Sequence, residues 1–158
     1  MIIINKRNLF FLISVWLLST LLSAQNVTIS TPHTQLLLSV PNGGTPEQLY
    51  YGSRTSDADI RSICETARRR NAYPVYGMGY PCETALSVRH ADGNLTLQMA
   101  VIGVKETRLT KENATLTVIE LKDKVYPFFV NICYKAWQDA DVIETWTEIR
   151  HEEKRRSA

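Results

Sequence analysis

The stretch "ATLTVIELKDKVYPFFVNICYKAWQDADVIETWTEIRH", residues 114–151, decides the fold. Three segments within it alternate apolar and polar residues: 114–123, 126–137 and 142–151. β-Branched and aromatic residues are frequent in all three, and the connections between them are short. Successive strands with short connections are typical of antiparallel sheets. The sequence therefore predicts an all-β fold, most simply an antiparallel β-sandwich.

The residues before this stretch add further strands and one irregular segment. Shorter strand patterns occur at 26–30, 34–40 and 47–52. Residues 53–72 are rich in charged and small polar side chains and show no strand alternation. We therefore expect a long loop there, with one helical turn.

The segment "YPVYGMGYPCETALSVRHADGNLTLQ", residues 73–98, combines a glycine-containing loop with an Asp-Gly turn. Apolar residues alternate with polar ones on both sides of "ADGN" (91–94). Asp and Gly tolerate the positive φ angles that a tight hairpin turn needs. We predict a β-hairpin with strands at 84–90 and 95–101, and we interpret the whole segment as part of the structural frame.

The first 24 residues have the pattern of an export signal. Lys6 and Arg7 precede an apolar run at 9–22, and Ser23-Ala24 supplies small residues for cleavage. This pattern predicts a signal peptide at 1–24, cleavage near Ala24 and a periplasmic or secreted protein. The apolar run is shorter than the roughly 20 residues that span a bilayer, so we expect no stable membrane insertion.

The charges argue against a nucleic-acid partner. The chain has 18 Lys and Arg and 16 Asp and Glu, and Lys6 and Arg7 fall within the predicted signal peptide. The remaining 16 positive charges balance the 16 negative ones, without the basic stripe that nucleic-acid binding requires. Arg68–Arg70 are expected to be solvated loop residues.

The titratable residues predict neither catalysis nor a metal or cofactor. Asp57 and Asp59 lie in the predicted loop, and Glu152 and Glu153 are adjacent near the end of the chain. Neither pair has surroundings that would keep one carboxyl protonated and the other ionised, as glycoside hydrolysis needs. The three histidines lie far apart, without metal-ligand spacing. We therefore expect no catalytic residue in this chain.

The cysteines and tryptophans leave alternatives open. Cys64, Cys82 and Cys133 permit one disulfide in an exported protein, but the sequence does not select a pair. Trp146 lies among carboxylates on one face of the last strand, where it could stack on a sugar ring or lie beneath a covering loop.

Several motifs, taken in order, resemble one known family. They are "LYYG" (49–52), "RTSDAD" (54–59), "YPVYG" (73–77), "HADGN" (90–94), "KDKVYP" (122–127) and "ETWTEIRHEEK" (144–154). The chain is similar over residues 26–154 to the N-terminal β-domain of glycoside hydrolase family 36, which consists chiefly of bacterial α-galactosidases.

The resemblance implies a supersandwich-like β-domain at 25–158 that packs on a (β/α)8 barrel and belongs to an enzyme able to form homo-oligomers. In the family the barrel binds the α-galactoside and carries both catalytic aspartates of a retaining mechanism. By position in the family pattern, we expect accessory substrate contacts from Arg54, Ser56, Asp57 and Tyr76. Trp146 joins them because carboxylates surround it.

The resemblance also implies a partial domain. Family members continue through more strands and the barrel, so we expect a sandwich that is incomplete at its C-terminus and inactive alone. The main alternative is a free-standing carbohydrate-binding module that stacks sugars on Trp137, Trp146, Tyr50 and Tyr51. A structural β-domain of an envelope protein is a third interpretation.

Overall fold

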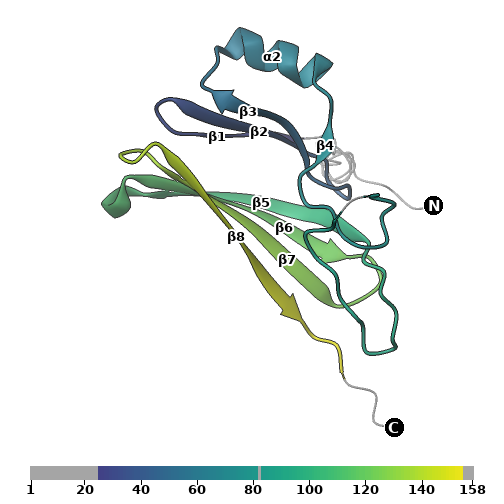
Figure 1. Ribbon diagram of the computed structural model, residues 1–158. Coiled ribbons are helices and arrows are strands. Elements are labelled where there is room, and N and C mark those ends of the chain that lie inside the picture. The colour runs from purple at the N-terminus through teal and green to yellow at the C-terminus, as the bar shows by residue number, and fades with distance from the viewer. Residues whose placement is uncertain (1–24, 82, 155–158) are drawn as a thin grey trace, which may run out of the picture.

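The computed structural model describes residues 25–81 and 83–154. It contains two antiparallel four-stranded sheets that share one core, with a helix outside them (Figure 1). The predicted all-β sandwich is confirmed. The predicted signal peptide lies outside the described residues. Within the described ranges, no helix has the length and apolar character needed to cross a membrane.

The strands follow one another in each sheet in chain order, as short antiparallel connections favour. The first sheet contains β1 (Gln25–Ser30), β2 (Thr34–Val40), β3 (Glu47–Ser53) and β4 (Arg70–Asn71). The second contains β5 (Met99–Leu109), β6 (Ala114–Asp123), β7 (Phe128–Trp137) and β8 (Val142–His151). Helix α2 (Asp57–Thr66) lies between β3 and β4, and the 3-10 turn η1 (Thr110–Glu112) joins β5 to β6. Strands β2, β6 and β8 have the bounds that the sequence predicts.

The core lies between the two sheets and consists of the alternating apolar side chains of their facing surfaces. In the second sheet, Val130 and Ile132 of β7 are buried beside Ile119 and Leu121 of β6. The first sheet supplies Val27 and Ile29 from β1 and Leu36, Leu38 and Val40 from β2. Removal of this apolar surface from water is the main force that joins the sheets.

Backbone and carboxylate hydrogen bonds also tie the two sheets together. The carboxylate of Asp141, in the β7–β8 turn, accepts from Thr31 Oγ1 at 2.5 Å and from the His33 N–H at 3.0 Å. Further along, the turn after β2 pairs with β5, because Gly43 N–H donates to the Val101 carbonyl at 2.9 Å. Turns of one sheet are therefore anchored on residues of the other.

The prediction of a long loop at 53–72 is wrong, because ten of these residues form helix α2. Ser56 is the N-cap: its hydroxyl accepts from the Asp59 N–H at 3.2 Å, and the Asp59 carboxylate accepts from the Ser56 N–H at 3.3 Å. This reciprocal capping box satisfies two backbone donors at the helix start. The half-buried residues share one helical face at spacings of three and four: Ile60, Ile63, Cys64 and Ala67.

The predicted hairpin at 84–101 is wrong as a pair of strands, although its turn is present. Gly93 has φ of +90°, and His90 N–H donates to the Asn94 carbonyl at 2.8 Å. The arms do not pair with each other, because residue Tyr76 takes their hydrogen bonds. Its N–H donates to Leu86 at 3.2 Å, and its carbonyl accepts from Leu97 at 2.9 Å.

Residues 74–77 lie between the two arms, and this insertion predicts that replacement of Gly77 lowers the stability of the fold. Its φ is +98°, and a Cβ there would lie 2.4 Å from Thr96 Cγ2. Gly79 also has positive φ, +73°, but nothing lies within 4 Å of its Cβ position. Urea denaturation should show a loss of about 1 kcal/mol for Gly79→Ala from backbone strain. Gly77→Ala should lose at least about 1 kcal/mol more, because it adds overpacking. Equal losses would contradict the insertion of residues 74–77 between the two arms.

Candidate functional site

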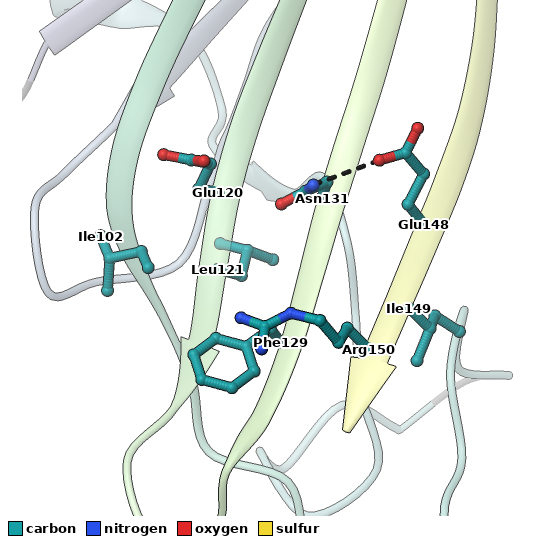
Figure 2. Close-up of a pocket in the computed structure, with 8 residues that line it drawn as sticks. All are labelled: Ile102, Glu120, Leu121, Phe129, Asn131, Glu148, Ile149 and Arg150. Atoms are coloured by element: carbon teal, nitrogen blue, oxygen red, sulfur yellow. Dashed lines mark hydrogen bonds between the residues drawn. The ribbon is translucent and has the colours of Figure 1, made fainter. Parts of the chain in front are cut away.

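The outward face of the β5–β8 sheet carries a groove of about 400 Å³ (Figure 2). Its floor crosses the strands β6, β7 and β8, and exposed Ile102 and Ile149 lie at its sides. The lining residues are Ile102, Glu120, Leu121, Phe129, Asn131, Glu148, Ile149 and Arg150. Two carboxylates, an amide, an aromatic ring and a guanidinium therefore meet on one surface.

The strand register places the polar groups in one row. Asn131 of β7 is opposite Glu120 of β6 on one side and Glu148 of β8 on the other. Adjacent strands are about 4.8 Å apart, so the backbones of the two glutamates are about 10 Å apart. Figure 2 shows the Asn131 amide between them, where its Nδ2 donates to Glu148 Oε2 at 3.2 Å.

Both carboxylates are held as acceptors of hydrogen bonds. Asn131 and then Trp146, through side-chain hydrogen bonds, lower the pKa of Glu148 from its ordinary value. Glu120 forms an ion pair with Lys105 Nζ at 2.5 Å. A glycosidase pair needs one carboxyl whose pKa is raised so that it can donate a proton. The environment of Glu148 acts in the opposite direction, so Glu148 is not suited to be this proton donor.

Two aromatic rings on this face, those of Phe129 and Trp137, are covered by cations of the same chain. The Arg150 guanidinium lies 4.0 Å from the centre of the Phe129 ring, as Figure 2 shows. Lys135 Nζ lies 3.8 Å from the Trp137 ring centre. Such contacts are favourable cation–π interactions. A sugar that stacked on the same ring faces would first have to displace these cations.

Three of the predicted accessory residues lie together at the beginning of α2. Ser56 caps this helix, Asp57 is its first residue, and Arg54 precedes them with its N–H bonded to the His33 carbonyl at 2.7 Å. All three are exposed. The Ser56 hydroxyl is already engaged with Asp59, because Oγ to Oδ2 is 2.7 Å.

The other two predicted residues lie elsewhere. Tyr76 is in the segment between β4 and β5, with 48% of its surface exposed. Trp146 is on the outward face of β8, half-buried, and its Nε1 donates to Glu148 Oε1 at 3.2 Å. In Figure 1, α2 lies above the first sheet, whereas β8 and the segment after β4 lie below it. The chain alone therefore does not gather the five residues into one site, and their role as substrate contacts stays a prediction.

Comparison with known proteins gives a family-model match and several structural matches. Residues 44–157 match the model "Glycosyl hydrolase family 36 N-terminal domain". The chain belongs to glycosyl hydrolase family 36. No curated protein sequence matches it.

The similar solved structures are enzymes of the same family. An α-galactosidase variant from Geobacillus stearothermophilus, in complex with 1-deoxygalactonojirimycin, gives a TM-score of 0.71 at 14% identity, over 82% of this chain and 22% of that one. The α-galactosidase from Lactobacillus brevis gives 0.67 at 16% identity, over 80% and 21%. The galactosidase domain of the α-galactosidase-sucrose kinase AgaSK gives 0.62 at 22%, over 77% and 21%. The chain thus spans about a fifth of each relative, and these likenesses show the fold.

Three of the motifs on which the resemblance rests meet around His90, a contact that the sequence analysis missed. The His90 side chain is fully buried, and its Nδ1 lies 2.6 Å from Glu153 Oε1. Glu153 Oε2 accepts from the Ala91 N–H at 3.0 Å. Glu153 therefore binds both the His90 ring and the backbone of the Asp-Gly turn. The motifs "HADGN" and "IRHEEK" could be identified from the sequence, but their contact depends on tertiary structure.

The third motif, "VYP", completes this cluster through Tyr126. The Tyr126 ring stacks on His90 with centroids 3.6 Å apart and planes at 9°. Its hydroxyl donates to Asp92 Oδ2 at 2.8 Å and accepts from Asn94 Nδ2 at 2.9 Å. The cluster clamps the segment 73–98 onto the ends of the second sheet. We find no structural reason to assign it a catalytic role.

The cysteines and metal ligands add no chemistry within the described residues. Cys64 and Cys133 are not bonded to each other, and Cys82 lies outside the described residues. Burial raises the pKa of Cys133 to about 11, which keeps its thiol protonated and unreactive. In the described part of the chain, no three potential ligand residues are grouped to hold a metal ion.

The clamp predicts an acid-sensitive contribution to stability. The Ala91 N–H, and after it His90, lower the pKa of Glu153. Because the carboxyl is more acidic in the folded state, its contribution is full at neutral pH. The contribution is lost as the pH falls below about 4.3, the ordinary pKa of glutamate, and then through the lower pKa that Glu153 has in the folded state. Glu153→Gln should cost about 2 kcal/mol at neutral pH and much less at about pH 3.

The neighbouring Glu152 provides a matched control for this measurement. Its carboxylate pairs with Arg150 at the surface, where both side chains are more than half exposed. Glu152→Gln should leave the urea midpoint almost unchanged at both pH values. A Glu153→Gln variant with the same pH dependence as Glu152→Gln would show that the clamp contributes nothing.

Proposed function

We propose that this chain is the non-catalytic N-terminal domain of an exported α-galactosidase-like enzyme. The observation that carries the proposal is the family match over residues 44–157, combined with coverage of only about a fifth of the α-galactosidases it resembles. In this proposal the domain packs on a (β/α)8 catalytic barrel, and the barrel hydrolyses terminal α-linked galactose with retention of configuration. Export rests on the signal-peptide pattern of residues 1–24.

The geometry supports a structural role for the domain. The carboxylates of Asp141 and Glu153 accept from backbone N–H groups, and the buried His90 ring pairs with Glu153 and stacks on Tyr126. The groove carboxylates of Glu120 and Glu148 already have donors from the same chain: Lys105 for the first, Asn131 and Trp146 for the second. A domain of this kind supplies a rigid surface against which a catalytic domain can be positioned.

Substrate contact by this domain is an accessory part of the proposal. Arg54, Ser56 and Asp57 are exposed at the start of α2, where they are free to face another domain or subunit. Tyr76 and Trp146 are separate from this group. The α-galactoside would reach these side chains only through the barrel or through a homo-oligomer.

A free-standing carbohydrate-binding module is the second candidate. Trp137 and Trp146 share the outward sheet face with three charged residues of β8, so aromatic and polar groups lie together there. The cations over Trp137 and Phe129 oppose it, since they occupy the ring faces that a sugar would need. Tyr50 also bonds its own chain, through its hydroxyl to the Ser53 carbonyl at 2.8 Å.

An assay for hydrolysis distinguishes the proposed non-catalytic domain from an active enzyme. Purified residues 25–158 should release no nitrophenol from p-nitrophenyl α-galactoside, because in this proposal the catalytic aspartates belong to the barrel. A mock purification from cells without the gene controls for contaminating hydrolases. Release above this control that disappears in Asp57→Ala would contradict the proposal.

Calorimetric titration distinguishes the proposed domain from a free-standing carbohydrate-binding module. Galacto-oligosaccharides should produce no measurable heat of binding with the isolated chain. Saturable binding that is lost in Trp146→Ala, with the fold intact by circular dichroism, would favour the module instead.

A further inference from the structure

A pocket of about 370 Å³ lies between helix α2, strand β3 and the residues that lead into β4. This volume is within the range of roughly 300–1,000 Å³ that is usual for ligand pockets. All the lining residues belong to the continuous segment 48–70. Figure 1 shows α2 of this segment above the first sheet, on the side away from the second. The walls of the pocket are therefore formed without any residue of β8 or beyond it.

Two arginine side chains line this pocket from the same side of the chain. Helix α2 ends before Ala67, whose φ of −63° and ψ of 141° are extended, and Arg70 begins β4. Successive side chains of an extended segment point to opposite sides. Arg68 and Arg70 accordingly both line the pocket, whereas Arg69 does not and instead pairs with Glu47 at 2.9 Å.

The charges of these two arginines are not balanced at the pocket. Within residues 25–81 and 83–154, neither Arg68 nor Arg70 forms an ion pair, although Arg69 and Arg150 both do. The lining contains no acidic side chain. Guanidinium groups bind carboxylates through parallel hydrogen bonds that their planar shape favours. The pocket is therefore suited to an anion.

The rest of the pocket is apolar and aromatic. Ile63 and Ala67 of α2 and the rings of Tyr50 and Tyr51 contribute to its walls. Tyr51 has 63% of its surface exposed, and among the described residues no cation lies over its ring. An exposed aromatic ring offers an apolar face on which a sugar ring can stack. A ring beside two guanidiniums thus fits a sugar that carries a carboxylate.

We propose that the pocket between α2 and β3 binds an acidic saccharide. The carboxylate of a uronate unit accepts hydrogen bonds from Arg68 and Arg70, and its sugar ring stacks on Tyr51. An acidic peptide fits less well, because its several carboxylates need more cations than these two and it has no ring to stack. This inference goes beyond the proposed function, since it assigns a binding site that takes no part in hydrolysis.

Calorimetric titration of the full mature chain with trigalacturonate tests this site. At low ionic strength binding should saturate at one site per chain, and it should weaken as salt screens the charges. Arg68→Gln and Arg70→Gln should each raise the dissociation constant at least about tenfold, because each removes charge-assisted hydrogen bonds. Arg61→Gln is the matched control: it removes the same charge from exposed Arg61 of α2, which does not line the pocket. This control should change the dissociation constant less than about twofold.

The contribution of the ring is tested by two variants of Tyr51 and by smaller probes. Tyr51→Ala should weaken the binding of trigalacturonate, whereas Tyr51→Phe keeps the ring and should bind like the unmodified chain. Neutral galactotriose should not bind, and inorganic phosphate, which has charge but no ring, should bind more weakly. Circular dichroism confirms that each variant folds.

Four outcomes would overturn the proposal. They are the absence of binding by trigalacturonate, binding that is insensitive to both arginine substitutions, equal affinity for phosphate, and equal affinity for tetraglutamate. Arginines that served only the carbonyl end of α2 would lower the urea midpoint when substituted and leave binding unchanged. None of these outcomes alters the expected absence of hydrolysis, so failure of this site is distinguishable from failure of the proposed function.

Discussion

The burial of apolar side chains between two sheets is the constraint on which the rest of the structure depends. Val130 and Ile132 on β7 face the same core as Leu36 and Leu38 on β2. Neither sheet can remove these residues from water alone, so the sheets fold against each other. Every other feature is positioned by that packing: the carboxylate of Asp141 between two turns, the helix outside the first sheet, and the groove on the outward face of the second.

Three of the four strands of the second sheet, β6, β7 and β8, could be predicted from the sequence, whereas only residues 99–101 of β5 were expected in a strand. Strand β7 alternates because one face is buried in the core and the other is not, and this alternation is visible in the sequence itself. The prediction of a hairpin at 84–101 is wrong because the pairing of its arms does not depend on alternation alone. Its alternation is real, since His90 is buried as expected for one face, but Tyr76 competes for the backbone hydrogen bonds of both arms. Local sequence cannot show which distant backbone takes a hydrogen bond.

Helix α2 and the His90 cluster show two further limits. The helix carried a readable signal, the Ser56–Asp59 capping box before apolar residues at helical spacing, but its high charge made a loop the simpler interpretation. The cluster had no local signal, because Glu153 lies 63 residues from His90. The family resemblance identified the motifs that meet there and the fold they share. The groove at Asn131 was not predicted, since strand register alone brings Glu120 and Glu148 to its two sides.

A domain that serves as a scaffold must behave as one rigid body. Native-state hydrogen exchange of the purified chain measures this property most directly, through the opening free energy of amides in the central strands β2 and β7. We predict that the slowest amides of both strands exchange with the same free energy, equal to that of global unfolding. A first sheet that opens at a much lower free energy than the second would contradict the account.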